Sequence, residues 1–279
     1  MKVHKIAAFS NGNQGGNPAG VVLSDQDLPD EQIMQSVAAE VGFSETVFAA
    51  KRESEQDWRV RYFSPESEVP FCGHATIALG AMLAKSYGQS EYTLQLNNAQ
   101  ITVAGESDNS LFKATLQSPP TKSEALNHDD IQQTLALFGY QTGQLDDVLP
   151  PAFIHGGADH YFFAVNSKQD LSAMDYDLEK GREFMRQKNI VTIMFCYRES
   201  DNLFHIRNAF ASGGVLEDPA TGAAAAAFSG YLRDIDWPSD GNIEIIQGED
   251  MGYPSRIFTQ FDSIKGSSIR VTGQAREME

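Results

Sequence analysis

The sequence predicts an α+β protein with two pseudo-symmetric lobes, each a mostly antiparallel, barrel-like sheet around one central buried helix. Three observations lead to this prediction. Short apolar runs of strand length occur throughout both halves of the 279-residue chain. Each half also contains one stretch without a polar face, which indicates a helix that is buried on every side. Those two stretches resemble each other in sequence.

Strands are predicted from the apolar runs and from the turn residues that separate them. The expected strands lie at residues 3–9, 21–23, 46–50, 58–63, 92–96, 100–105, 111–117, 160–165, 190–197 and 203–210. A glycine- and asparagine-rich loop at residues 11–20 separates the first two strands. A helix is predicted at residues 129–138 in the second half.

An amphipathic helix is expected between the second and third strands. Asp30 can cap it, and Ile33, Val37 and Val41 recur every four residues on one face. Gly42 is suited to the position just after a helix, where a left-handed conformation is common. Glu45 therefore follows a helix and stands at the entrance to a strand.

The two buried helices are predicted from His74 to Ala84 and from Ala223 to Leu232. Each is preceded by a glycine, by an acidic loop and by a strand that carries Arg and Phe. We expect an internal duplication with a period of about half the chain. The alternative interpretation is that any buried helix selects small and apolar residues.

A composition change at Ser118 to Ala125, with two prolines, predicts the linker between the lobes. We therefore expect a first lobe at residues 1–118 and a second lobe at residues 119–266. The C-terminal tail, about 267–279, is expected to pack back on the first lobe.

Charge argues against two classes of partner. The chain has 38 Asp and Glu against 21 Lys and Arg, a formal charge of −17. Nucleic acid and anionic membranes both attract clustered basic residues, so neither is an expected partner. No apolar run is long enough to span a membrane, and the charged start does not resemble a signal peptide. With only Cys72 and Cys196, the cytoplasm is the expected compartment.

The starts of the buried helices are candidate anion sites. The first N–H groups of a helix have no partner within it, and the helix dipole favours negative charge there. Gly73 and Gly222 let a ligand approach the backbone closely. We expect the two helix starts to hold a small carboxylate within reach of Glu45, His74 and Asp218.

Five motifs occur in a specific order: GNPAGVVL, SETVF, RYFSPESEVPFCGHAT, EDPATGAA and IIQGEDMGYPS. Together they resemble the PhzF family of phenazine-biosynthesis-type isomerases, a branch of the diaminopimelate-epimerase-like fold. The resemblance runs from Gly16 to Ser255. It implies a homodimeric isomerase that uses no cofactor and moves a proton on a small cyclic or unsaturated carboxylic acid.

The resemblance also implies roles for individual residues. Glu45 of the SET motif is the implied acid/base, and His74 and Asp218 complete the expected catalytic set. The expected substrate-binding residues are Asn17, Cys72, Gly73, Ala75, Thr221, Gly222 and Ala223. The family pattern has serine at the position of Ala223 and arginine at the position of Tyr253.

Each candidate has an alternative interpretation. Glu45 would serve equally as a strand-start carboxylate in an ion pair, His74 as a core histidine, and Asp218 as a helix cap. Burial disfavours the charged form of a carboxyl group, and the apolar residues after Glu45 make such burial expected. Cys72 has no partner thiol in the second acidic loop, so a two-thiol mechanism is not expected.

No metal site is expected. His155, Asp159 and His160 match no standard zinc spacing, which leaves a metal hydrolase almost without support. The alternative function from a different class is a non-catalytic protein of the same fold that binds small carboxylates. The change to Ala223 favours that alternative, whereas Glu45 together with His74 favours catalysis.

Overall fold

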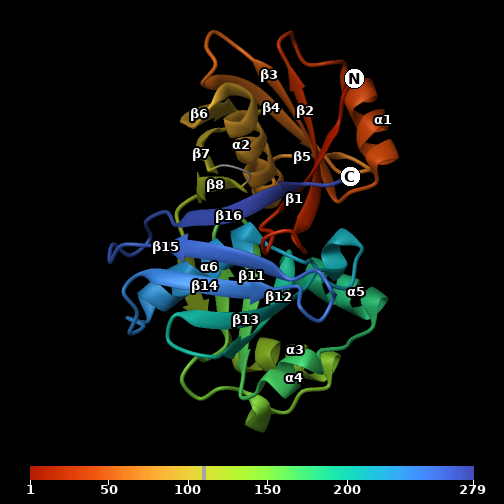
Figure 1. Cartoon of the computed structure of the whole chain (residues 1–279). Coiled ribbons are helices and arrows are strands. Elements are labelled where there is room, and N and C mark those ends of the chain that lie inside the picture. The colour runs from red at the N-terminus through yellow and green to blue at the C-terminus, as the bar shows by residue number, and fades with distance from the viewer. Residues whose placement is uncertain (109–110) are drawn as a thin grey trace. The chain divides into compact units, whose positions relative to one another are not determined.

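The computed structural model describes residues 1–108 and 111–279, and the chain divides into two compact units (Figure 1). Unit 1 consists of residues 1–117 and 272–279, and unit 2 of residues 118–271. The C-terminal segment therefore belongs to the same unit as the N-terminus.

Unit 1 is an eight-stranded closed barrel. Its strands follow the order β1-β2-β3-β4-β6-β7-β8-β16, and pairing of β1 with β16 closes the circle. A short strand, β5, pairs with β4 outside this path. The strands are β1 (His4–Ala8), β2 (Asn17–Ser24), β3 (Glu45–Lys51), β4 (Asp57–Phe63), β5 (Glu68–Val69), β6 (Ser90–Gln95), β7 (Gln100–Asp108), β8 (Leu111–Gln117) and β16 (Arg270–Glu277).

Helix α2 (Gly73–Tyr87) packs against β1, β2, β3, β7 and β8 of the barrel. All residues from His74 to Ala84 are buried, which confirms the helix without a polar face. Helix and strand approach closely at two glycines. A Cβ atom on Gly105 of β7 would lie 2.3 Å from the carbonyl oxygen of Gly80 in the helix.

Helix α1 (Glu31–Val41) covers the other face of the sheet, where Met34 and Ala38 pack with Phe48 and neighbouring apolar residues. The prediction centred the buried face of this helix on Ile33, Val37 and Val41, and this was wrong, because Ile33 is 49% exposed. The buried residues are Met34 and Ala38, each one position after a predicted residue and with the same four-residue spacing. The buried face is therefore rotated by about 100° around the helix axis. The predicted end is confirmed, since Gly42 has a φ of 70°.

Unit 2 contains a seven-stranded sheet in the order β15-β14-β13-β12-β11-β10-β9. Helix α6 (Gly222–Asp234) packs against β9, β10, β11 and β15. The strands are β9 (Lys122–Ala125), β10 (Ala152–His155), β11 (Asp159–Val165), β12 (Thr192–Arg198), β13 (Leu203–Ala209), β14 (Asn242–Gln247) and β15 (Ser255–Gln260).

A second apolar core in unit 2 joins this sheet to the remaining helices. Leu135 and Phe138 of α3, Leu171 of α4 and Met185 of α5 pack there around Phe195 of β12. The helices are α3 (His128–Phe138), α4 (Lys168–Ser172) and α5 (Leu178–Lys188).

The same pairing pattern occurs in both units. In unit 1, β2 is parallel to β3, β3 antiparallel to β4, β4 parallel to β6 and β6 antiparallel to β7. Unit 2 has the same alternation: β11 is parallel to β12, β12 antiparallel to β13, β13 parallel to β14 and β14 antiparallel to β15. Helices α2 and α6 lie at equivalent positions in the chain, between β4 and β6 and between β13 and β14. The predicted α+β fold with two pseudo-symmetric lobes is confirmed.

Two segments that were expected to be loop or linker contain strands. β2 begins at Asn17, inside the expected glycine-rich loop, because residues 17–20 pair with β1. β9 lies inside the expected linker, where it pairs with β10. In both cases the hydrogen-bond partner, and not the local composition, determines the conformation.

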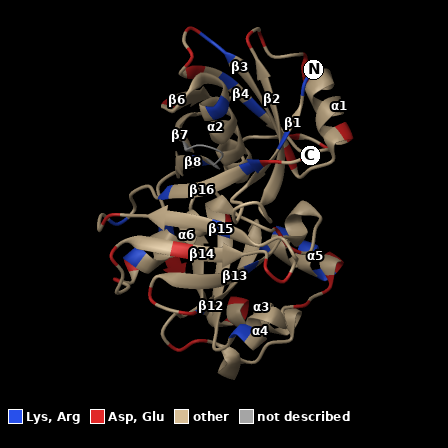
Figure 2. Cartoon of the chain, in the orientation of Figure 1, with Lys and Arg blue, Asp and Glu red and all other residues tan. Residues whose placement is uncertain are grey.

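Charged residues of both signs are interspersed along the ribbon, as the neighbouring blue and red segments of α5 show (Figure 2). None of the helices in the described part of the chain combines the length and the hydropathy needed to cross a membrane.

Candidate active site

Glu45 is the first residue of β3 and is fixed by the strand next to it. It is the register partner of Ala19 in the parallel strand β2. Thr46, Val47 and Phe48, which follow it, are fully buried. The Glu45 side chain itself keeps 16% exposure. A carboxyl group at this position is held by a rigid strand and still reaches solvent.

Cys72 and His74 lie at the start of α2. Cys72 is the N-cap residue, with an extended backbone, and it makes no side-chain hydrogen bond to the helix N–H groups. His74 is the second residue of the helix and is 7% exposed. The first N–H groups of a helix have no intrahelical acceptor, so this start can bind an anion through the backbone of Gly73, His74 and Ala75.

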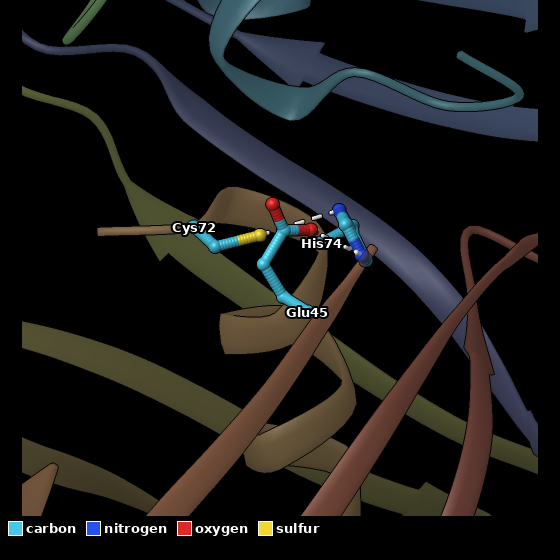
Figure 3. A group of neighbouring side chains, drawn as sticks. All are labelled: Glu45, Cys72 and His74. Carbon is cyan, nitrogen blue, oxygen red and sulfur yellow. Dashed lines mark hydrogen bonds and ion pairs between the residues drawn. The ribbon is translucent and has the colours of Figure 1, made fainter. Parts of the chain in front are cut away.

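The three side chains point toward one another (Figure 3). His74 Nε2 lies 3.4 Å from Glu45 Oε2. Its other ring nitrogen, Nδ1, lies 3.3 Å from Cys72 Sγ. The structure thus brings together Glu45 and His74, two of the three expected catalytic residues, with Cys72 beside them.

Further residues, for which no role was predicted, support this cluster. Ser44 Oγ lies 3.3 Å from His74 Nε2, so the imidazole has a second polar neighbour. Thr76 Oγ1 donates to the carbonyl of Cys72 at 2.7 Å and contacts the hydroxyl of Tyr62 at 2.7 Å. Burial raises the pKa of Tyr62, so this phenol stays protonated. The quoted motifs contain all three residues, but only the structure shows their contacts.

Asn17 is the first residue of β2 and is 2% exposed. It stands two residues before Ala19, the register partner of Glu45. Residues two apart on a strand share a face, and register partners do too. Asn17 therefore lies on the same face of the sheet as Glu45.

In unit 2, Asp218 belongs to a buried polar network that includes Thr221, the N-cap residue of α6. The Thr221 hydroxyl donates to the Asp218 carboxylate. The same hydroxyl accepts from Asn208 at 2.6 Å and from Gln247 at 3.1 Å. The Gln247 amide also donates to the carbonyl of Asp218 at 2.7 Å. Asn208 and Gln247, which had no predicted role, thus fix the loop that carries Asp218.

Helix α6 begins at Gly222 and, like α2, lacks a side-chain cap. Ala223, the second residue of this helix, is partly exposed. The hairpin between β10 and β11 packs against this first part of the helix. A Cβ atom on Gly156 would lie 2.6 Å from the backbone nitrogen of Ala227 and 3.0 Å from the carbonyl oxygen of Ala223.

The histidines of that hairpin differ in their surroundings. His155 Nδ1 lies 2.6 Å from Asp159 Oδ1 at the surface. His160 is fully buried, with Nδ1 2.6 Å from Thr192 Oγ1, and burial lowers its pKa to about 3. Among the described residues these side chains do not gather as a metal-ligand set.

A family model for phenazine biosynthesis-like proteins, named PhzC-PhzF, matches residues 6–279. The chain is 30% identical over 277 residues to an uncharacterized isomerase of Deinococcus radiodurans, covering 95% of this chain and 88% of that protein. It is also 30% identical over 270 residues to trans-2,3-dihydro-3-hydroxyanthranilate isomerase of Pseudomonas fluorescens, covering 95% and 92%.

Solved structures show the same fold. The phenazine biosynthesis protein of the PhzF family from Bacillus anthracis superposes with a TM-score of 0.85 at 23% sequence identity. The match covers 100% of this chain and 98% of that one. The predicted diaminopimelate-epimerase-like fold is therefore confirmed.

Proposed function

This chain belongs to the family of phenazine biosynthesis-like proteins and is an isomerase, and we propose that it moves a proton on a small cyclic or unsaturated carboxylic acid. The observation that carries the proposal is the pair of Glu45 and His74, 3.4 Å apart at the start of a buried helix. One carboxyl group that gives and takes a proton is sufficient for such a reaction, and we propose no cofactor.

Glu45 is the proposed acid/base. In an allylic isomerisation, its carboxylate removes a proton from one carbon while the double bond moves. The resulting carboxylic acid then returns a proton to another carbon, so the atoms balance and Glu45 ends in its starting state. Positioned proton transfer of this kind typically contributes about 10²–10⁴-fold in rate.

His74 is the proposed positioning and hydrogen-bonding partner. Its Nε2 lies 3.4 Å from Glu45 Oε2 and 3.3 Å from Ser44 Oγ. From this position the imidazole can hold the Glu45 carboxyl group by a hydrogen bond in the orientation that proton transfer requires.

The substrate carboxylate is proposed to bind to backbone N–H groups at a helix start. At α2 these are the groups of Gly73, His74 and Ala75, and the absence of a side-chain cap supports the assignment. In unit 2 we propose the corresponding role for Gly222 and Ala223 at the start of α6, with Thr221 and Asp218 as binding residues.

The substrate of the Pseudomonas fluorescens relative, trans-2,3-dihydro-3-hydroxyanthranilate, is the first compound to test. Ala223 stands where the family pattern has serine, which removes one hydroxyl from the proposed binding element. We therefore propose a substrate of the same class whose recognition does not need that hydroxyl. The non-catalytic alternative is not favoured, because the relatives are named isomerases.

Turnover by Glu45→Gln and Glu45→Asp tests the acid/base assignment. Glu45→Gln keeps the size of the side chain and removes the proton-carrying group, so turnover should fall by at least about 10²-fold. Glu45→Asp moves the carboxylate back by one methylene and should recover little. Wild-type turnover in a correctly folded Glu45→Gln variant would contradict the proposal.

We also propose a homodimer and a reducing, cytoplasmic compartment. The dimer follows from the family resemblance, and the two cysteines, which are buried and not joined in a disulfide, support a reducing compartment. Sedimentation velocity tests the assembly and should give twice the chain mass of 30.6 kDa. A sedimenting species of 30.6 kDa at micromolar concentration would contradict it.

A further inference from the structure

Glu45, Cys72 and His74 together form a set of metal-ligand atoms. One carboxylate oxygen, one sulfur and one imidazole nitrogen lie within 4.8 Å of one another. These are the three atom types that Zn²⁺ binds in proteins, at about 2.0–2.3 Å. No other group of three or more such side chains occurs among the residues that the structure describes.

We propose that this set binds Zn²⁺ or a similar ion, and that the bound ion inhibits the isomerase. The inhibitory part rests on the proposed function, because the ion would occupy the carboxylate lone pair with which Glu45 takes up the proton and would withdraw His74 from its positioning role. The ion is therefore a regulator or an inhibitor of the site and not a cofactor of the reaction.

The present separations are close to those of a metal site. Two ligands about 2.0–2.3 Å from a tetrahedral ion lie roughly 3.3–3.7 Å from each other. Cys72 Sγ to His74 Nδ1 is 3.3 Å, and His74 Nε2 to Glu45 Oε2 is 3.4 Å. Only one imidazole nitrogen can bind the ion, and with one atom from each residue the three ligand atoms lie within 4.8 Å of one another. The longest of these separations therefore has to close by at most about 1 Å. Rotation of the Cys72 and Glu45 side chains is the movement that we propose for this.

Ser44 makes the histidine suitable as a ligand. Metal-binding histidines usually donate their second ring N–H to a nearby acceptor, which fixes the tautomer and the ring orientation. When Nδ1 binds the ion beside Cys72, Nε2 can donate to Ser44 Oγ, which lies 3.3 Å away. The supporting contact is thus already present.

The ligand types select the ion. Thiolate and imidazole suit Zn²⁺ and chemically similar ions, whereas Mg²⁺ and Ca²⁺ require mainly oxygen ligands. Three protein ligands leave a fourth tetrahedral position open for water or a carboxylate. The site is accessible because the Glu45 side chain is 16% exposed.

Cobalt(II) is the probe for the test, because it substitutes for zinc and gives visible bands together with a cobalt–thiolate charge-transfer band. The reduced full-length protein should bind one equivalent and show that band. Cys72→Ser should abolish the band and weaken binding at least about tenfold. His74→Gln and Glu45→Gln should weaken binding by similar factors. Cys196→Ala is the matched control, since the other thiol lies in β12, and it should keep the band.

Each outcome decides one claim. A band that survives Cys72→Ser, or that is lost in folded Cys196→Ala, overturns the site. Zinc binding that leaves turnover unchanged, or turnover that a chelator abolishes and zinc restores, overturns the inhibition. Cobalt binding by a Glu45→Gln variant that turns over like the wild type contradicts the proposed function and leaves the metal site standing.

Discussion

At the residue scale, the protonation of His160 should make the stability of the protein depend on pH. Burial lowers its folded-state pKa to about 3, whereas an unfolded histidine has a pKa near ~6.5. Between these values the unfolded state binds the extra proton. The free energy of unfolding should therefore fall as the pH drops from about 6.5 to about 3, at about 1.4 kcal/mol per pH unit for this group.

The His160→Gln variant isolates that contribution, because a glutamine does not titrate. Urea unfolding of wild type and variant at several pH values should show a shallower slope in the variant. The slopes would be equal if the histidine were protonated in the folded protein at mildly acidic pH.

The Thr221 hydroxyl contacts three polar residues, so Thr221→Val should be costly. The change leaves Asn208, Gln247 and Asp218 each without one hydrogen-bond partner. An unpaired buried polar group typically costs about 1–3 kcal/mol. Chemical denaturation should show that the free energy of unfolding falls by at least about 2 kcal/mol. Thr221→Ser keeps the hydroxyl, and a loss of similar size in that control would contradict the network.

At the element scale, the close contact of α2 with β7 should not tolerate a methyl group. The Cβ of Gly105→Ala would meet the carbonyl oxygen of Gly80 at 2.3 Å. Neither backbone can move without disturbing the barrel, so the free energy of unfolding should fall by about 1–3 kcal/mol or more.

Gly143→Ala is the control for that substitution, because nothing lies within 4 Å of its Cβ position. Its φ is not positive either, so its effect should stay within about 0.5 kcal/mol. Equal denaturation midpoints for the two variants would show that the contact is not tight.

The two central helices could be predicted because their residues are apolar on every side, a pattern that few other structures produce. The buried face of α1 could not be predicted, because Ile33 and Val37 have the same four-residue spacing as Met34 and Ala38. Residues 17–20 of β2 and the whole of β9 were missed, because their strand conformation depends on pairing with β1 and β10, which composition does not encode. Motifs predicted Glu45 and His74. The contact of Ser44 with His74 and that of Gln247 with Asp218 depend on segments that are distant in sequence.

At the scale of the whole molecule, a bound carboxylate should raise the stability of the protein. A ligand that binds only the folded state at 100 times its Kd contributes about 2.7 kcal/mol. Thermal-shift measurements with small cyclic carboxylates, among them 3-hydroxyanthranilate, should therefore raise the Tm, and uncharged amides of the same compounds should not. Equal shifts for acids and amides would contradict an anion site at the helix starts.

The central claim is that Glu45 carries a proton between two carbons of the substrate. It is tested most directly by deuterium incorporation from heavy water into trans-2,3-dihydro-3-hydroxyanthranilate, or into the best carboxylate from the thermal-shift screen. Wild type and Glu45→Gln are compared side by side at saturating ligand. We predict that the wild type introduces deuterium and that Glu45→Gln binds the ligand with exchange reduced at least about 10²-fold. Equal exchange by the two proteins would contradict the assignment and transfer the role to another acid or base.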